Sequence, residues 1–333
     1  MRVSVIATVR DEADSIETFL HSLFRQTRPP AEIVVVDGGS TDGTLDVLRR
    51  RREKNPSLRV LHAPGANISQ GRNIAISHAM GPIIAVTDAG TVVARDWLER
   101  LVHPLEADPT IGVSAGFFDP GGETFFERCL SVVITPQLPE IDPERFLPSS
   151  RSVAFRKEWW ERVGGYPEWL EHCEDLVFDL ELKRAGAAFA FTPEARVAWR
   201  ARPSLRRFYR QYYLYARGDG HAALWPKRHA VRYGAYATGA ALFAAGFALP
   251  AAWLALALGV GVHLGRYYRR LWRRPPEGGF GARLAAAALV PAIVVTGDVA
   301  KMHGYPRGLI ERRRAGSPLA LAPEPTQIRE VDA

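Results

Sequence analysis

Acidic residues at three places in this 333-residue chain have neighbours suited to ligand chemistry. Asp37 ends the apolar run VVVD and precedes two glycines, Asp88 ends a second apolar run, and Glu174 and Asp175 form an acidic turn. A carboxylate at a strand end can accept hydrogen bonds from a nucleotide base or ribose, while glycines let a ligand approach the backbone. The simpler alternatives are a capped Asp-Gly turn at Asp37 and helix capping at Asp175.

The elements that must position these residues follow the pattern of βαβ units. Short apolar runs alternate with helix-period stretches, which is typical of an α/β fold with a parallel sheet. Strands are predicted over 3–9, 32–36, 58–61 and 83–87, and helices over 15–26, 41–52 and 175–184. Ligands of such sheets bind at the carboxyl ends of the strands, where Asp37 and Asp88 fall.

The charge of the chain indicates a membrane surface more than nucleic acid. The net charge is +7, and most of the excess lies after residue 200, where basic residues flank apolar runs. This placement suits anionic lipid, and the aromatic-and-basic strand pattern of an RNA reader is missing. The two cysteines have no metal-ligand or disulfide spacing, which fits a reducing cytoplasm.

The C-terminal third contains apolar segments of unusual length. Residues 233–264 carry no Asp, Glu, Lys or Arg, and Pro250 divides them into two arms. Basic residues at both ends favour a helical hairpin over one span, and arms of about 15 residues are shorter than the about 20 that cross a bilayer. A buried hairpin of a soluble domain is the alternative. Residues 274–281 are predicted to form a linker, and 284–296 an interfacial segment.

Several motifs in the first half occur together in the order SVIATVRDEADSI, SLFRQTRPP, EIVVVDGGSTDGT and ISQGRNIAISHAMGPIIAVTDAG. This series resembles the family 2 glycosyltransferases over about residues 1–220. The resemblance implies an inverting enzyme with a GT-A Rossmann-like mixed sheet flanked by helices. It implies a catalytic domain over 1–222, to which we add a helical membrane-associated region over 223–315 and a disordered tail over 316–333.

The resemblance also implies a nucleotide-sugar site. Asp37 would recognise the base, with Ser40 in the same turn, and Arg72 would lie against the base or diphosphate. Its guanidinium suits either role, and an exposed helix arginine is the alternative. Three further residues would line the same site: Thr8, Arg10 and Glu12.

Asp88 matches the first position of the Asp-x-Asp motif with which the family binds ribose and a divalent metal. The chain continues with Ala89 and Gly90, so the second carboxylate is missing. Mg²⁺ or Mn²⁺ at Asp88 is still expected, because hard cations are often held by few protein ligands and the substrate. Some relatives add a downstream histidine, but the matching stretch here reads VAWR, and His172 is more simply a loop residue.

Glu174-Asp175 resembles the Glu-Asp motif in which the aspartate is the base. Asp175 would accept the proton of the acceptor hydroxyl, and Glu174 would orient Asp175 or bind the acceptor. The segment 204–221 lacks the Gln-x-x-Arg-Trp motif of processive relatives, which favours single additions. Its arginines would contact phosphate groups or lie on a membrane.

The leading hypothesis is transfer of a hexose from a UDP- or GDP-sugar to a lipid-linked or membrane-proximal acceptor, in envelope or exopolysaccharide synthesis. The enzyme would lie on the cytoplasmic face of the plasma membrane, anchored through residues 233–297. A nicotinamide-dependent oxidoreductase is disfavoured, because RDE and not G-x-G-x-x-G follows the first strand. A non-catalytic sugar-nucleotide-binding or scaffold protein is the remaining alternative.

Overall fold

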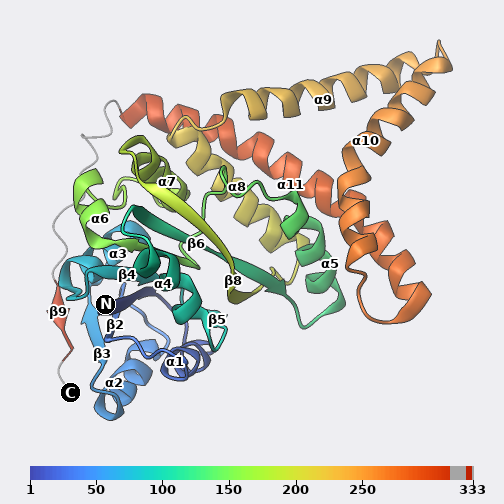
Figure 1. Ribbon diagram of the computed structural model, residues 1–333. Coiled ribbons are helices and arrows are strands. Elements are labelled where there is room, and N and C mark those ends of the chain that lie inside the picture. The colour runs from blue at the N-terminus through green and yellow to red at the C-terminus, as the bar shows by residue number, and fades with distance from the viewer. Residues whose placement is uncertain (316–327, 332–333) are drawn as a thin grey trace. The chain divides into compact units, whose positions relative to one another are not determined.

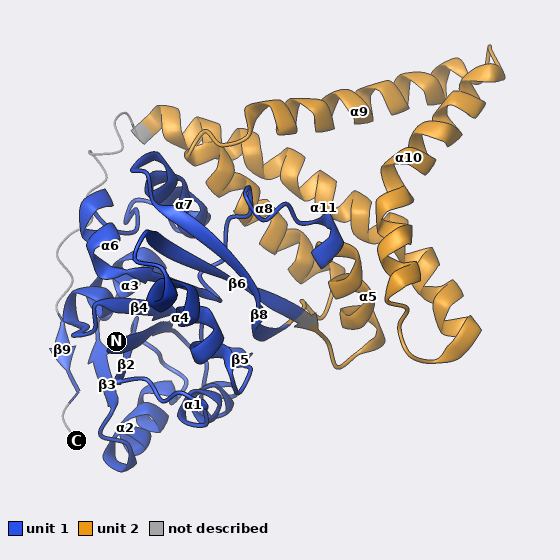
Figure 2. Ribbon diagram, in the orientation of Figure 1, with its two compact units in different colours: residues 1–119, 138–199, 318–333 blue, residues 120–137, 200–317 orange. Residues whose placement is uncertain are grey.

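A computed structural model describes residues 1–315 and 328–331. The chain forms two compact units, coloured separately in Figure 2. The first contains residues 1–119 and 138–199 with the C-terminal strand, and the second contains residues 120–137 and the chain from Arg200 through the last helix. The second unit thus begins before the boundary expected at residue 222.

The first unit is built on a mixed nine-stranded sheet (Figure 1). The strand order is β5-β8-β6-β7-β4-β1-β2-β3-β9, with β4, β1, β2 and β3 parallel and the pairs β4·β7, β6·β7, β5·β8 and β3·β9 antiparallel. The strands are β1 Val3–Val9, β2 Glu32–Asp37, β3 Leu58–His62, β4 Ile83–Val86, β5 Thr91–Val93, β6 Ile111–Gly121, β7 Val153–Arg156, β8 Ala188–Arg200 and β9 Arg329–Glu330.

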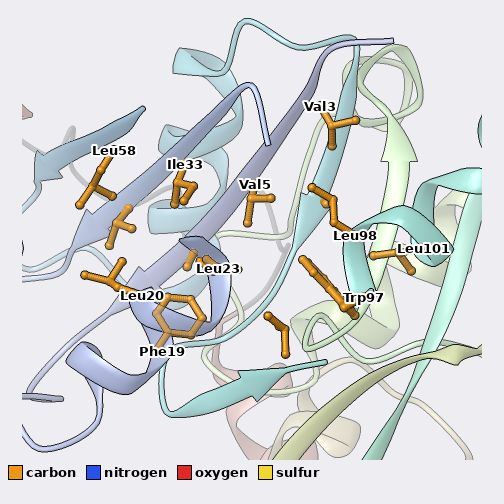
Figure 3. Close-up of a cluster of buried hydrophobic side chains, with 14 of the residues drawn as sticks. Val3, Val5, Phe19, Leu20, Leu23, Ile33, Leu58, Trp97, Leu98 and Leu101 are labelled. Atoms are coloured by element: carbon orange, nitrogen blue, oxygen red, sulfur yellow. The ribbon is translucent and has the colours of Figure 1, made fainter. Parts of the chain in front are cut away.

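Helices cover both faces of this sheet. Alternate strand residues point to opposite faces, so Val5 and Ile33 pack with α1, α2 and α4, whereas Ile6 and Val34 pack with α3 and α7. Figure 3 shows the first of these layers, with Phe19, Leu20 and Leu23 of α1 beside the strands. The helices of this unit are α1 Ile16–Phe24, α2 Thr44–Lys54, α3 Ile68–His78, α4 Trp97–Ala107, α6 Lys157–Val163 and α7 Glu174–Arg184.

The sequence prediction of an α/β fold with a mixed sheet and flanking helices is confirmed. The four parallel strands lie where they were expected, within one residue at each end, because runs of mostly buried residues mark them. The C-terminal tail was expected to be disordered. Residues 316–327 and 332–333 of it lie outside the described residues, whereas Arg329–Glu330 form β9 against β3.

The second unit is helical. It consists of α5 Phe125–Ile134, α8 Leu205–His221, α9 Pro226–Ala245, α10 Ala251–Arg273 and α11 Gly279–Ala315. The expected hairpin is present as α9 and α10, with the turn at Pro250. The expected linker ends earlier than predicted, since α11 begins at Gly279 and runs unbroken past two prolines, Pro291 and Pro306.

Close packing of α8 on α11 explains how so long a helix is stabilised. A β-carbon added at Gly304 would lie 2.2 Å from the Tyr213 carbonyl oxygen, and one at Gly308 would lie 2.0 Å from that of Arg217. On α8, a β-carbon at Gly220 would lie 2.2 Å from the Tyr305 carbonyl oxygen. We call these three glycines the glycine seam, because only glycine allows the two backbones to approach this closely.

Apolar side chains are exposed around the turn of the hairpin. Phe247 is 77% exposed, Leu249 60% and Leu254 65%. Of the described helices, α11 alone is long and apolar enough to cross a membrane, judged by length and composition over Gly279–Arg314. A core helix of a soluble protein would meet the same two criteria, so this finding makes α11 a candidate span and no more.

Candidate functional site

The carboxyl group of Asp37 is fully buried where β2 ends. Its Oδ1 accepts hydrogen bonds from the backbone N–H groups of Gly39 and Ser40, at 3.0 and 3.1 Å, and lies 2.9 Å from His62 Nδ1. The turn requires Gly39 at φ 94°, a left-handed conformation that favours glycine. Oδ2 is equally buried and has no hydrogen-bond partner in the part of the chain that the structure describes. An unpaired buried carboxylate oxygen is costly, so this atom is suited to a donor from a ligand.

Hydrogen bonds from backbone N–H groups to side-chain hydroxyl groups join the loop after β1 to the segment that follows Asp37. Ser40 Oγ accepts a hydrogen bond from the Asp11 N–H at 2.9 Å, and the Glu12 N–H donates to Thr44 Oγ1 at 2.8 Å. Thr8 is paired with Val36 in the sheet, one residue before Asp37. The expected residues Thr8, Glu12 and Ser40 therefore lie at the same sheet edge as Asp37.

The remaining residue expected on this loop, Arg10, is exposed. The side chain of Glu12 does not follow its backbone N–H group toward Thr44. It accepts a hydrogen bond from Ser15, and its Oε2 would lie 3.2 Å from a β-carbon added at Gly90. Glu12 thus faces the turn that follows β4, which carries Asp88.

Arg72 joins two of the acidic positions that the sequence singled out. Its Nη1 donates to Glu174 Oε1 and its Nη2 to Asp88 Oδ1, both at 2.7 Å. The guanidinium lies 5.2 Å from the centroid of the Tyr166 ring, and the side chain is only 2% exposed. The alternative of an exposed surface arginine is wrong. Arg72 instead brings Asp88 and Glu174 into one buried charge cluster.

The two carboxyl groups of this cluster have different protonation behaviour. Burial acts to raise the pKa of Asp88, but the charges of Arg72 and Arg151 outweigh it and hold that pKa below its usual value. Burial raises the pKa of Glu174 to about 7, against the effect of Arg72 and with a contribution from Asp175. Asp88 is therefore a carboxylate at neutral pH, while Glu174 titrates close to neutrality.

Asp175 and Asp179 lie one turn apart on α7. Asp175 is partly exposed, and its Oδ1 accepts a hydrogen bond from the Leu176 N–H at 2.8 Å within the first turn of α7, whose N-cap residue is Cys173. Its partial exposure leaves it the more accessible of the Glu174-Asp175 pair. Asp179 is buried, its Oδ2 has no hydrogen-bond partner within the described ranges, and burial raises its pKa well above the usual value. The sequence did not single out Asp179, although an aspartate between Phe178 and Leu182 on a buried helix face is an unusual placement.

Arg151 is a further residue that the sequence did not indicate. It precedes β7, its Nε lies 3.8 Å from Asp88 Oδ2, and its guanidinium carbon lies 5.0 Å from the centroid of a Trp199 ring. Trp199 of β8 is paired with Thr91 of β5, which follows the Asp88 turn. No local pattern predicts this contact, because it depends on the pairing of two strands about 100 residues apart.

The residues around Asp88 do not fit a divalent metal well. Both oxygens of Asp88 face a guanidinium, and among residues 1–315 and 328–331 no group of three or more His, Cys, Asp or Glu side chains is arranged to hold a metal ion. Two unit charges 4 Å apart interact by about 4 kcal/mol at an effective dielectric constant near 20. A metal ion bound by Asp88 would therefore be repelled by two nearby guanidinium groups, those of Arg72 and Arg151.

Known proteins resemble this chain in sequence and in fold. A family model described as glycosyl transferase family 2 matches residues 4–162. Glycosyltransferase AglE of Haloferax volcanii is 28% identical over 228 residues, which cover 67% of this chain and 74% of that protein. The succinoglycan biosynthesis protein ExoA of Rhizobium meliloti is 27% identical over 224 residues, covering 64% and 68%.

A solved structure shares the fold. It is the mannosyltransferase PcManGT from Pyrobaculum calidifontis, described in complex with GDP-Man and Mn²⁺, with a TM-score of 0.56 and 23% identity over 95% of this chain and 88% of that one. At 23% identity this similarity shows a shared fold. The family match covers the sequence motifs that contain Asp37 and Asp88. By its similarity to these relatives the chain is a glycosyltransferase, and its residues 4–162 match glycosyl transferase family 2.

Proposed function

We propose that this enzyme transfers a hexose, with inversion, from a UDP- or GDP-sugar to a lipid-linked or membrane-proximal acceptor in envelope or exopolysaccharide synthesis. The observation that carries the proposal is the buried Oδ2 of Asp37, which has no hydrogen-bond partner among the described residues. A nucleotide base offers N–H donors, and one of them would satisfy this oxygen. Arg72 and Asp88 lie at the same sheet edge, where the ribose and diphosphate would follow.

The proposed reaction uses Asp175 as the base. The oxygen of the acceptor hydroxyl attacks the anomeric carbon, the bond from that carbon to the diphosphate oxygen breaks, and the hydroxyl proton passes to the Asp175 carboxylate. The diphosphate leaves with the bonding electron pair, and positive charge nearby stabilises it. Glu174 holds Arg72 in place through the 2.7 Å ion pair, so we assign Glu174 a positioning role.

Positive charge for the diphosphate has two possible sources. The family resemblance suggests Mg²⁺ or Mn²⁺, which Asp88 would hold and which would supply positive charge to the diphosphate, and the PcManGT structure is described with Mn²⁺. The chain's own guanidinium groups are the other source. The poor fit of Asp88 to a metal favours the second, and removal of divalent ions with EDTA tests the first.

The second unit supports a membrane-proximal acceptor. Exposed apolar side chains at the turn of α9 and α10 would enter the apolar boundary of a bilayer, and basic residues flank the hairpin. We propose attachment at the cytoplasmic face of the plasma membrane through residues 233–297. The similarity to ExoA, a succinoglycan biosynthesis protein, favours an acceptor used in polysaccharide assembly.

The experiment that tests catalysis separates binding from transfer. Purified protein is incubated with each UDP- and GDP-sugar and a bacterial lipid extract, and glycosylated lipid is detected by mass spectrometry. Asp175→Asn should bind the nucleotide as the wild type does but lose about 10²–10⁴-fold in turnover, the range for general acid–base groups. Asp142→Asn, the same change at an exposed aspartate, is the matched control.

A non-catalytic sugar-nucleotide-binding protein would give a different result. It would bind UDP or GDP, form no glycosylated lipid with any donor, and be unaffected by Asp175→Asn. The missing second carboxylate after Asp88 is the observation that favours this alternative. Binding of no nucleotide at all would overturn both functions.

A further inference from the structure

Two departures from the family's metal-binding pattern meet at one place in the sheet. Gly90 stands where a second carboxylate is expected, and Trp199 lies in the stretch where some relatives have a histidine. The β5·β8 ladder pairs Trp199 with Thr91, the residue after Gly90. The two positions that would complete a metal site are therefore neighbours, and neither provides a ligand.

Arg151 is located at this place. Its Nε lies 3.8 Å from Asp88 Oδ2, its guanidinium stacks 5.0 Å from a Trp199 ring centroid, and its Nη1 donates to Ser149 Oγ at 3.1 Å. The side chain is 20% exposed, so the group is held but still reached by solvent. Stacking on an aromatic ring occupies the face of a guanidinium and does not use the N–H donors in its plane.

The distance from Arg151 to Asp88 is informative. At 3.8 Å the pair is attracted electrostatically but is too far apart for a hydrogen bond. The other oxygen of Asp88 is bound by Arg72 at 2.7 Å, so Asp88 does not depend on Arg151 for a partner. An anion arriving beside Asp88 can thus recruit Arg151 without breaking a hydrogen bond between the two residues.

We propose that Arg151, supported by Trp199, binds the diphosphate of the donor, so that a nucleoside diphosphate binds without a divalent ion. This inference rests on the proposed function, because it assumes that the nucleotide occupies the edge defined by Asp37 and Asp88. The inference adds Arg151 to the proposed donor site and predicts that its guanidinium provides positive charge for the diphosphate. A guanidinium suits the task, because its planar fork can donate two hydrogen bonds to phosphate oxygens.

The test measures dissociation constants of UDP and GDP by calorimetry, in EDTA and in Mn²⁺, with uridine and guanosine for comparison. The nucleotide that binds the wild type should keep its affinity within about threefold in EDTA. Arg151→Gln should weaken its binding about 10- to 100-fold, as expected for loss of a charged hydrogen bond, and leave the nucleoside unchanged. Arg151→Lys should recover part of the loss, because it keeps the charge but not the fork.

Arg196→Gln is the matched control. Arg196 also lies on the first unit and pairs with a carboxylate, Asp119 at 2.8 Å, but it does not contact Asp88. Its substitution should leave all affinities unchanged, and thermal unfolding should show that every variant is folded.

Two results would overturn the inference while leaving the proposed function in place. One is a diphosphate affinity that EDTA abolishes in the wild type, and the other is an Arg151→Gln protein that binds the diphosphate normally in EDTA. If neither UDP nor GDP binds under any condition, the proposed function fails, and the inference fails with it.

Discussion

Asp37→Asn tests the assignment of the base site most directly, because it changes one atom of a buried side chain. The Asn side-chain oxygen can retain the contacts that Oδ1 makes with the N–H groups of Gly39 and Ser40. The amide then places an NH₂ group at the position of Oδ2, which is buried and has no hydrogen-bond partner in residues 1–315 and 328–331. An acceptor is thereby replaced by a donor where we propose that a base N–H arrives.

The expected loss follows from the kind of bond removed. A hydrogen bond to a charged group contributes about 1.5–3 kcal/mol, and each 1.4 kcal/mol is tenfold in affinity. Asp37→Asn should therefore weaken nucleotide binding by about 10- to 150-fold. In the variant, the NH₂ group of the asparagine would also face the N–H group of the base. Repulsion between these two donors adds to the loss, so the loss should be at least as large as this range.

Calorimetric titration with UDP, GDP and their nucleosides provides the assay. The loss should be as large for the nucleoside as for the diphosphate, because the contact is to the base. Asp46→Asn, at an exposed aspartate that pairs with Arg49 on α2, should bind normally. A folded Asp37→Asn protein with wild-type affinity for the nucleoside would refute the assignment of Asp37 to base recognition.

Three further predictions concern the cluster, the membrane surface and the core. The raised pKa of Glu174, about 7, means that its contribution to stability is fully present below the unfolded value of 4.5 and is lost as the pH rises through 7. Chemical denaturation of wild type and Glu174→Gln from pH 4.5 to 8 should show this decline in the wild type relative to the variant, and parallel profiles would contradict it. Phe247→Ser combined with Leu254→Ser should lower co-sedimentation with phosphatidylglycerol vesicles at least about tenfold, because each lost side chain contributes about 1.5–3 kcal/mol when buried. Unchanged partitioning would exclude the hairpin as the attachment site. Leu20→Ala should reduce the free energy of unfolding by about 2–5 kcal/mol in urea titrations, since Leu20 is fully buried, and a change below 1 kcal/mol would be inconsistent with that packing.

The sequence predicted those parts of the fold and site that local pattern determines. Asp37 was placed at a strand end from the run VVVD alone, and β2 does end at that residue, after valines that are buried on both faces of the sheet. Asp88 was placed in the same way. The amphipathic spacing of Ile16, Phe19 and Leu23 predicted α1, and each of these side chains is fully buried.

The parts that were missed depend on contacts between distant segments. The ion pair of Arg72 with Glu174 joins residues 102 apart, and the sequence could not show that Arg72 is buried. Arg151 reaches Asp88 only because β7 and β8 return to the parallel strands from beyond residue 150. Pro291 favoured the prediction of a short segment, whereas packing on α8 stabilises a helix of 37 residues around it.

The glycine seam has a consequence for how this chain can be shortened. One side of the seam lies on α8, before the apolar hairpin, and the other lies on α11, after it. Any truncation from the C-terminus that removes the hairpin must remove α11 first, and a fragment ending at residue 222 would expose the face of α8 that fits only the α11 backbone. The hairpin is thus enclosed in sequence by two helices that pack on each other, and it is anchored in the protein at both ends rather than appended to it.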